Sequence, residues 1–190
     1  MDRLARRLDY EEMKVAFAFL LSVPGAPFIY YGDEIGMRYV ENLISVEGGY
    51  GRTGSRSPMQ WDKTTNAGFS SAPKEKLYIK QDDSPDRPDA MSQMADENSL
   101  RSEIKRLIAV RMANPALQSN GAIEFISDGY PLVYRRSCDS QEIMVVINPA
   151  DKPCEVSCDG KDIIYSVGEK ASLNGGKITI NGAGAAFILL

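Results

Sequence analysis

The stretch VAFAFLLSVPGAPFIYYGDEIGM, residues 15–37, joins two apolar runs through a Pro-Gly break. The first run is part of residues 10–23, which are apolar almost all round, so a helix there must be covered on most of its sides. Pro24 and Gly25 end this helix, and residues 28–31, FIYY, then predict a short buried strand. A helix, a short turn and a buried strand form half of a parallel α/β unit.

Residues 41–90 follow, and they show neither helical nor strand periodicity. Loops this long in compact domains are usually functional or disordered. Aromatic and turn-forming residues in 47–70 predict an ordered loop, whereas the polar residues 80–96 predict a weakly packed segment. The ordered part contains RSPMQWD, residues 56–62, and with it the only tryptophan of the chain.

The C-terminal half of the sequence begins with a helical pattern and continues with strands. Asn98 or Ser99 is a good N-cap before apolar residues at helical spacing, which predicts an amphipathic helix that ends at Asn114-Pro115. Turn signals then separate short runs rich in β-formers, at residues 123–127, 132–136, 143–147, 154–157, 163–165, 177–180 and 186–190. Such a series is typical of a small antiparallel β-sandwich. The sequence therefore predicts an α+β chain with domains at residues 1–115 and 116–190.

Composition limits the partners of the chain. The net charge is -4 and the Lys and Arg residues are scattered, so we do not expect nucleic acid as a partner. The apolar run at residues 15–23 is about half as long as a membrane span requires, which predicts no membrane partner. Charged residues precede this run over a full helical turn, so the pattern predicts no signal peptide.

The cysteine and acidic residues predict neither a metal nor a cofactor. Three cysteines and a complete absence of histidine indicate free thiols rather than a disulfide framework or a zinc site. Free thiols favour a reducing compartment, which points weakly to the cytoplasm. The acidic cluster at residues 82–86 lacks the Gly and the distal Glu of a calcium-binding loop, so we interpret it as a solvated turn.

Several motifs point to one family. They are GAPFIYYGDEIGM (residues 25–37), GSRSPMQWD (54–62) with NAGFS (66–70), and IKRLIAVRMANPAL (104–117). Together they resemble the C-terminal part of an alpha-amylase superfamily glycoside hydrolase, of the alpha-glucosidase, oligo-glucosidase or trehalose synthase type. The resemblance implies that residues 1–115 form the end of a catalytic (β/α)8 barrel, with a helix, strand 8, a long active-site loop and the last helix. Residues 116–190 would be its C-terminal β-sandwich domain.

The resemblance also implies a sugar site. In barrel enzymes, the loops at the C-terminal ends of the strands build the active site, so the loop after Tyr31 should lie above it. Arg56 and Trp61 are the implied substrate-binding residues, for an alpha-glucoside or a maltooligosaccharide. In the family, the matching Arg pairs with an acid from an early barrel loop, which this sequence does not include. A structural ion pair for Arg56 and a loop-packing role for Trp61 remain the alternatives.

No catalytic residue is expected in this chain. The family takes its nucleophile, its acid/base and a stabilising Asp from barrel strands 4, 5 and 7, and the resemblance places all of these upstream. A sequence without His cannot contain the Asn-His-Asp motif of the third group or a Ser-His-Asp triad. The adjacent acids Asp33 and Glu34 should point to opposite faces of a strand, so they are poorly placed to flank one bond. We therefore expect the chain alone to be inactive.

Two other expectations concern assembly and a rival function. A barrel remnant cannot close, so the first helix and residues 28–31 should expose an apolar patch that promotes self-association or disorder. The rival function is a carbohydrate-binding or structural β-sandwich module without catalysis, although the predicted strands lack a row of exposed aromatic residues. The sequence leaves open which alpha-glucoside is used, and whether it is hydrolysed or transferred.

Overall fold

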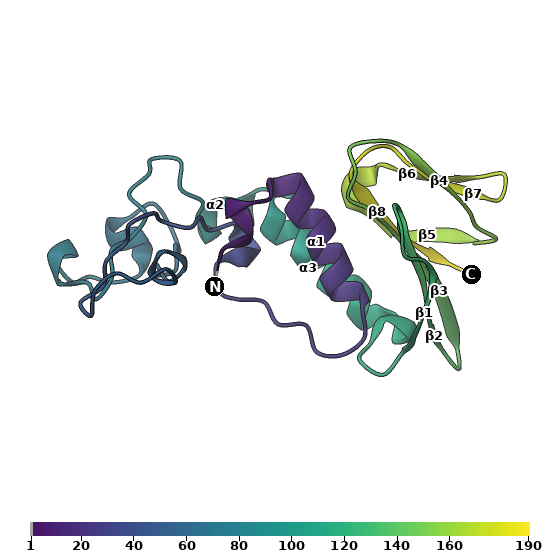
Figure 1. Cartoon of the computed structure of the whole chain (residues 1–190), viewed down its shortest axis with the longest axis horizontal. Coiled ribbons are helices and arrows are strands. Elements are labelled where there is room, and N and C mark those ends of the chain that lie inside the picture. Colours follow the sequence, from purple (N-terminus) through teal and green to yellow (C-terminus); the bar gives the residue numbers. More distant parts are fainter. Residues whose placement is uncertain (1) are drawn as a thin grey trace. The chain divides into compact units, whose positions relative to one another are not determined.

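The computed structural model describes residues 2–190. Its helices are α1 (Tyr10–Ser22), α2 (Ala90–Ala95) and α3 (Leu100–Ala113), labelled in Figure 1. Its strands are β1 (Ala122–Ser127), β2 (Leu132–Cys138), β3 (Gln141–Asn148), β4 (Cys154–Ser157), β5 (Asp162–Ser166), β6 (Ala171–Asn174), β7 (Lys177–Ile180) and β8 (Gly184–Leu189). No helix within residues 2–190 is long and apolar enough to cross a membrane.

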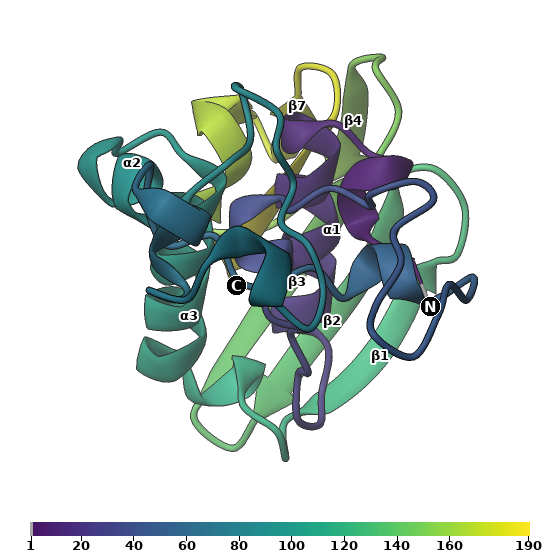
Figure 2. The same cartoon turned by 90° about the vertical axis from the view of Figure 1, so that its left-hand side faces the viewer.

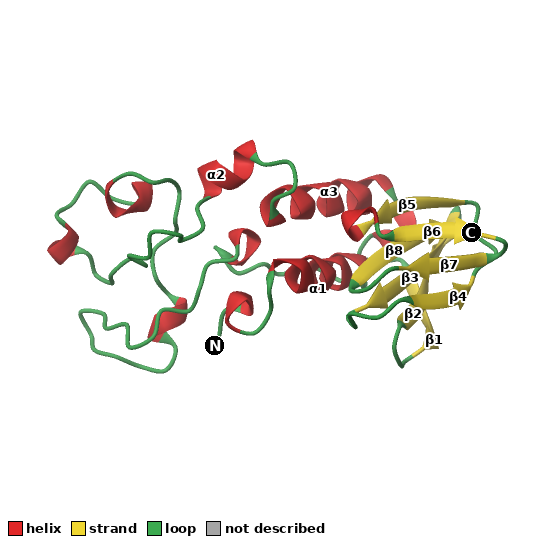
Figure 3. Cartoon of the chain, turned by 90° about the horizontal axis from the view of Figure 1, so that it is seen from above, coloured by secondary structure: helices red, strands yellow, loops and turns green. Residues whose placement is uncertain are grey.

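The described residues form two units. Unit 1 comprises Met1–Met13 and Ile29–Ser102, and Figure 3 shows that loops make up most of it. Unit 2 comprises Lys14–Phe28 and Glu103–Leu190, and it contains all the strands described. The predicted boundary between residues 115 and 116 falls inside unit 2, because the greater parts of α1 and α3 group with the sheets.

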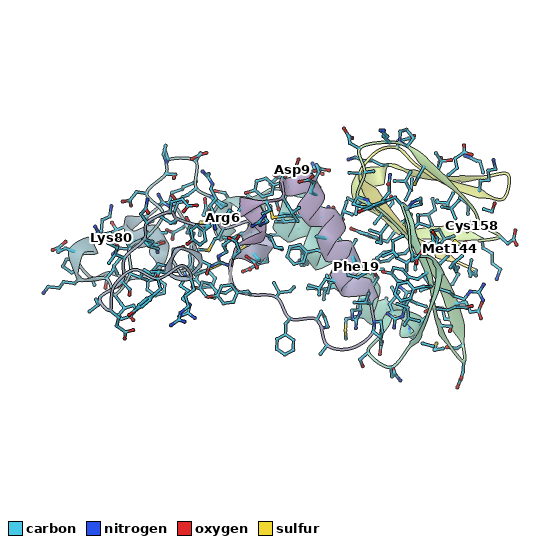
Figure 4. The ribbon with its side chains drawn as sticks, viewed as in Figure 1. Arg6, Asp9, Phe19, Lys80, Met144 and Cys158 are labelled. Atoms are coloured by element: carbon cyan, nitrogen blue, oxygen red, sulfur yellow. The ribbon has the colours of Figure 1, made fainter. Side chains whose placement is uncertain are left out.

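The core of unit 2 lies between two antiparallel sheets. The larger sheet has the strand order β1-β2-β3-β8-β5, and the smaller has the order β4-β7-β6. Buried side chains from both sheets share one cluster, which consists of Val133, Met144, Val146, Cys158, Ile178, Ile180, Ala186 and Ile188. Figure 4 labels Met144 and Cys158 among them. Each of the seven runs predicted from residue 123 onward overlaps a strand, whereas β6 was not predicted because its sequence ASLN offers a single large apolar residue, Leu173.

The other face of the larger sheet is covered by helices. Figures 1 and 2 both show α1 against strands β1, β2 and β3. Phe19 on α1, labelled in Figure 4, meets the ring of Tyr134 edge-on with the centroids 6.5 Å apart. Ser22 Oγ hydrogen-bonds to the Tyr134 hydroxyl at 2.5 Å, and the Tyr165 hydroxyl donates to the buried carboxylate of Glu103 on α3. The central strand β3 is therefore buried on both faces.

Two buried arginines hold the C-terminal end of α1. The last carbonyl groups of a helix have no partner within the helix, and a positive charge near them is favourable. Arg111 donates to the carbonyl oxygens of Leu21, Val23 and Gly25 at 2.7, 2.8 and 2.7 Å. Arg136 on β2 donates to Ser22 O and to three carbonyls of the segment after α3, those of Gln118, Gly121 and Ala122.

The prediction of a buried strand at residues 28–31 is wrong. This segment has no regular secondary structure, and the Phe28 side chain is 91% exposed. A strand of a parallel sheet is stabilised by backbone hydrogen bonds to its neighbours on either side. Among the described residues no strand precedes β1, so this segment has no neighbour to pair with. Self-association through the exposed Phe28 stays a prediction.

Candidate functional site

Unit 1 contains a pocket of about 470 Å³. Ligand pockets in proteins usually measure roughly 300–1,000 Å³, so the volume suits a small molecule. Both predicted substrate-binding residues, Arg56 and Trp61, line it, and Glu34 is the other charged residue of the lining. The rest of the lining is apolar or aromatic and consists of Tyr31, Pro58, Met59, Phe69, Leu77, Tyr78 and Ile79.

Backbone hydrogen bonds on two sides hold the RSPMQWD segment in place. Trp61 N donates to Ala67 O at 2.9 Å. On the other side, the first residues of α2 donate to this segment, with Ala90 N at 3.0 Å from Gln60 O and Met91 N at 2.9 Å from Trp61 O. The segment is thus ordered without being a helix or a strand, because its backbone groups find partners in neighbouring loops.

Arg56 and Trp61 are both open to a ligand. The Arg56 side chain is exposed, and its guanidinium forms no hydrogen bond or ion pair with the side chains and backbone groups that the structure describes. The structural ion pair considered for Arg56 is therefore not found among the described side chains. The Trp61 ring is 52% exposed although it belongs to the pocket lining. The site thus combines a free planar donor group with an open aromatic surface.

Asp33 and Glu34 lie in a 3-10 turn (Asp33–Ile35) rather than on a strand, so the alternation predicted for a strand does not apply to them. Their side chains nevertheless have different surroundings. Asp33 forms an ion pair with Arg3 at 3.0 Å. Burial raises the pKa of Asp33, and the hydrogen bond from Arg3 opposes that rise. Glu34 lines the pocket, and its Oε2 atom is buried without a hydrogen-bond partner. Glu34 is therefore the acidic group of the pocket, a role that the alternation of side chains did not reveal.

Arg3 connects the start of the chain to the pocket. Its fully buried guanidinium lies over the rings of Tyr30 and Tyr31, 4.7 and 5.0 Å from their centroids, and donates to Tyr31 O. The Tyr31 hydroxyl in turn donates to Ser57 O at 3.1 Å. Burial, reinforced by the hydroxyl of Tyr30, raises the pKa of Tyr31 to about 12. Arg3 thus positions a residue of the pocket wall, although it does not line the pocket itself.

The segment at residues 80–96 is better packed than its polar sequence predicts. Asp82, interpreted above as part of a solvated turn, is buried, and its carboxylate accepts hydrogen bonds from Ser84 N and Oγ. Asp89 is buried too and caps α2, with Oδ1 accepting from Ser92 N at 2.8 Å and Oδ2 lying 3.0 Å from Lys63 Nζ. These contacts are local hydrogen bonds of Asp side chains, which composition alone does not reveal.

Asp89→Asn should flatten the loss of stability that the protein shows on acidification. Burial alone would raise the pKa of Asp89, but the hydrogen bonds from Ser92 and the Lys63 cation bring it below its ordinary value. A lowered folded-state pKa adds stability above the unfolded-state pKa, and this stability is lost as the pH falls through the folded-state pKa. Asn keeps the capping oxygen but does not titrate. Urea denaturation from neutral to acidic pH measures the difference between the two proteins.

An exposed acid provides the control for this prediction. Asp83 pairs with Lys74 at 2.6 Å, but both side chains are more than half exposed, so Asp83→Asn should change the free energy of unfolding by less than about 1 kcal/mol. Parallel pH profiles for wild type and Asp89→Asn would contradict the role assigned to Asp89.

Among the side chains that the structure describes, no three from His, Cys, Asp or Glu lie close enough together to hold a metal ion. Cys138, Cys154 and Cys158 are free thiols.

Comparisons with known proteins agree with the motifs. The family model of the alpha-amylase catalytic domain matches residues 2–120. Trehalose synthase/amylase TreS of Mycobacterium tuberculosis is 34% identical over 168 residues, which cover 83% of this chain and 27% of TreS. A human amino acid transporter heavy chain is 42% identical over 71 residues, covering 37% of this chain and 10% of its own length. The chain thus spans about a quarter or less of the curated relatives named here.

Solved structures show a similar fold. Trehalulose synthase MutB of Pseudomonas mesoacidophila superposes with a TM-score of 0.79 at 22% identity, covering 94% of this chain and 38% of MutB. A MutB mutant in complex with glucose gives a TM-score of 0.79 at 23% identity, with the same coverage. At this identity the likeness shows the fold alone, and that fold fits part of a (β/α)8 barrel followed by antiparallel sheets. Since the family model matches more than half of its residues, the chain belongs to the alpha-amylase family of glycosidases and transglucosylases.

Proposed function

We propose that the pocket lined by Arg56 and Trp61 binds the glucosyl group of an alpha-glucoside. A sugar ring presents apolar faces and a rim of hydroxyls, so its site needs an aromatic surface together with hydrogen-bonding groups. Trp61 offers the surface, Arg56 offers donors, and Glu34 Oε2 offers an acceptor that has no hydrogen-bond partner among the described residues. The observation that carries the proposal is the unpaired, exposed guanidinium of Arg56 beside the open Trp61 ring in one pocket.

In the intact enzyme, this pocket would form part of a site for glycosidase or transglucosylase chemistry. Residues 1–115 would supply the end of the catalytic barrel, and residues 116–190 would form the C-terminal domain that supports it. The names of relatives support this proposal, since they include a trehalose synthase/amylase and a trehalulose synthase. The motifs around Arg56 and Trp61 lie within the part of the chain that the catalytic-domain model matches.

We further propose that residues 1–190 alone bind sugar without cleaving it. Glycosidases need two carboxyl groups that flank the bond, whether they retain or invert the configuration. Glu34 is the only carboxyl group in the described lining of the pocket. The neighbouring Asp33 does not line the pocket and forms an ion pair with Arg3. Glu34 alone can accept a hydrogen bond from a hydroxyl, but it cannot supply both a nucleophile and an acid.

Titration with methyl α-D-glucoside tests the binding proposal. Trp61 is the only tryptophan, so its fluorescence reports on this pocket. Arg56→Ala should raise the dissociation constant about tenfold, because it removes a charge-assisted hydrogen bond. Arg52→Ala is the matched control, because Arg52 is also exposed in the same loop but lies outside the pocket lining. The proposal fails if the sugar leaves the fluorescence unchanged, or if wild type and Arg56→Ala bind it equally.

The rival function, sugar binding by the sheets, has less support. Tyr134, Tyr165 and Phe187 are buried, which leaves Phe125 and Tyr130 as the exposed aromatic residues between 122 and 190. Calorimetric heat of sugar binding that persists in Trp61→Ala and disappears in Tyr130→Ala would favour the sheet over the pocket.

A further inference from the structure

The pocket has a second wall, formed within residues 69–79. Phe69, Leu77, Tyr78 and Ile79 line the same pocket as Trp61. Phe69 and Tyr78 are 51% and 54% exposed, so their rings are open to a ligand. The site therefore presents aromatic surface from this segment as well as from Trp61.

Hydrogen bonds hold the second wall in place before any ligand arrives. Asn66 Nδ2 donates to Ser70 O at 2.8 Å and to Ala72 O at 2.7 Å, which fixes the chain just after Phe69. Val46 N donates to Tyr78 O at 3.0 Å and ties the far end of the segment to a neighbouring loop. A wall that is already ordered loses little conformational entropy on binding.

The polar groups of the pocket are unevenly distributed. Arg56 and Glu34 are its charged residues, and both lie outside the second wall. The second wall offers one polar side-chain group, the hydroxyl of Tyr78. A second sugar ring placed there would meet a single polar side chain, so its hydroxyls would gain few hydrogen bonds from this wall. An aromatic ring has no hydroxyls to desolvate and can pack against the rings of Phe69 and Tyr78.

We infer that the pocket prefers alpha-glucosides whose aglycone is an apolar ring. The glucosyl group lies at Arg56 and Trp61, and the aglycone packs against Phe69, Leu77 and Tyr78. This inference rests on the proposed function, and it adds the class of substrate to it.

The test compares phenyl α-D-glucoside, methyl α-D-glucoside and phenol in titrations of the full chain, followed by Trp61 fluorescence. Phenyl α-D-glucoside should bind about tenfold more tightly than methyl α-D-glucoside, because the phenyl ring gains aromatic contacts. Phenol should bind more weakly than phenyl α-D-glucoside. This comparison uses the unmodified chain, so it does not depend on the folding of a variant.

A matched pair of variants locates the aglycone. Phe69→Ala should raise the dissociation constant of phenyl α-D-glucoside about fivefold more than it raises that of methyl α-D-glucoside. Phe125→Ala removes a phenylalanine of similar exposure, 57%, that lies outside the pocket, and it should change neither constant.

Each contrary outcome identifies what has failed. Equal constants for the two glucosides would overturn the preference for an apolar aglycone and leave the sugar site standing. Binding of neither glucoside would overturn the proposed function and this inference with it. If phenol bound as tightly as phenyl α-D-glucoside, the glucosyl group would contribute nothing to binding. That result would also overturn the proposed function and the inferred preference for an apolar aglycone.

Discussion

Arg136→Met should lower the free energy of unfolding by about 4 kcal/mol. The fully buried guanidinium donates to the carbonyls of Ser22, Gln118, Gly121 and Ala122. Met fills a similar volume but donates no hydrogen bond, so these carbonyls would lose their partner, at about 1–3 kcal/mol for each that stays buried and unpaired. Urea denaturation followed by circular dichroism measures the change.

The neighbouring residue on β2 is the control for this prediction. Arg135 lies 3.8 Å from Glu124 in a partly exposed pair, so Arg135→Met should cost less than about 1 kcal/mol. Similar losses for the two variants would show that the carbonyl contacts of Arg136 do not stabilise unit 2.

Arg3→Met should destabilise the local structure around the pocket by about 3 kcal/mol and weaken binding of methyl α-D-glucoside. The substitution leaves the carboxylate of Asp33 without its cation, and it removes the donor to Tyr31 O. Tyr31, and Glu34 next to Asp33, both line the pocket. Hydrogen exchange of the backbone amides at residues 32–37 reports the local opening, and the Trp61 titration reports the loss of affinity.

The effect of Arg3→Met should also depend on pH. Burial raises the pKa of Asp33, so the folded state holds this proton more tightly than the unfolded state does. The stability that Asp33 contributes by holding this proton is present below its unfolded-state pKa, and it is lost as the pH rises through its folded-state pKa. Without Arg3 the pKa rises further, so the deficit should be smallest in acid and grow towards neutral pH. Arg7→Met, which removes a mostly exposed arginine 3.6 Å from Asp2, should show little effect at any pH. A pH-independent deficit would contradict the pairing of Arg3 with Asp33.

Local patterns predict much of unit 2. The helices at residues 10–22 and 100–113 follow from apolar periodicity and breakers, and the strands follow from β-rich runs between turns. The segment FIYY has the same apolar character, but it forms no strand because the described residues provide no parallel neighbour. A strand forms only when another segment pairs with it through backbone hydrogen bonds. Apolar composition can therefore predict a buried strand, but it cannot show that a neighbouring strand is present.

The site was predictable only where a motif identified it. The motif around RSPMQWD led to Arg56 and Trp61, and the structure places both in one pocket. Arg3, Glu34 and Tyr78 follow no local pattern. Arg3 contacts Tyr31 and Asp33, which lie 28 and 30 positions further along the sequence. Tyr78 belongs to a segment without periodicity. Contacts over such separations depend on the tertiary structure, which propensities do not determine.

A glucose-release assay with the purified chain and maltose tests most directly whether this polypeptide holds a sugar subsite without the groups that cleave the glycosidic bond. We expect no glucose above the buffer control, under conditions in which methyl α-D-glucoside changes the fluorescence of Trp61. Sustained glucose release that Glu34→Gln abolishes would contradict the proposal, because it would show a complete catalytic site within these residues.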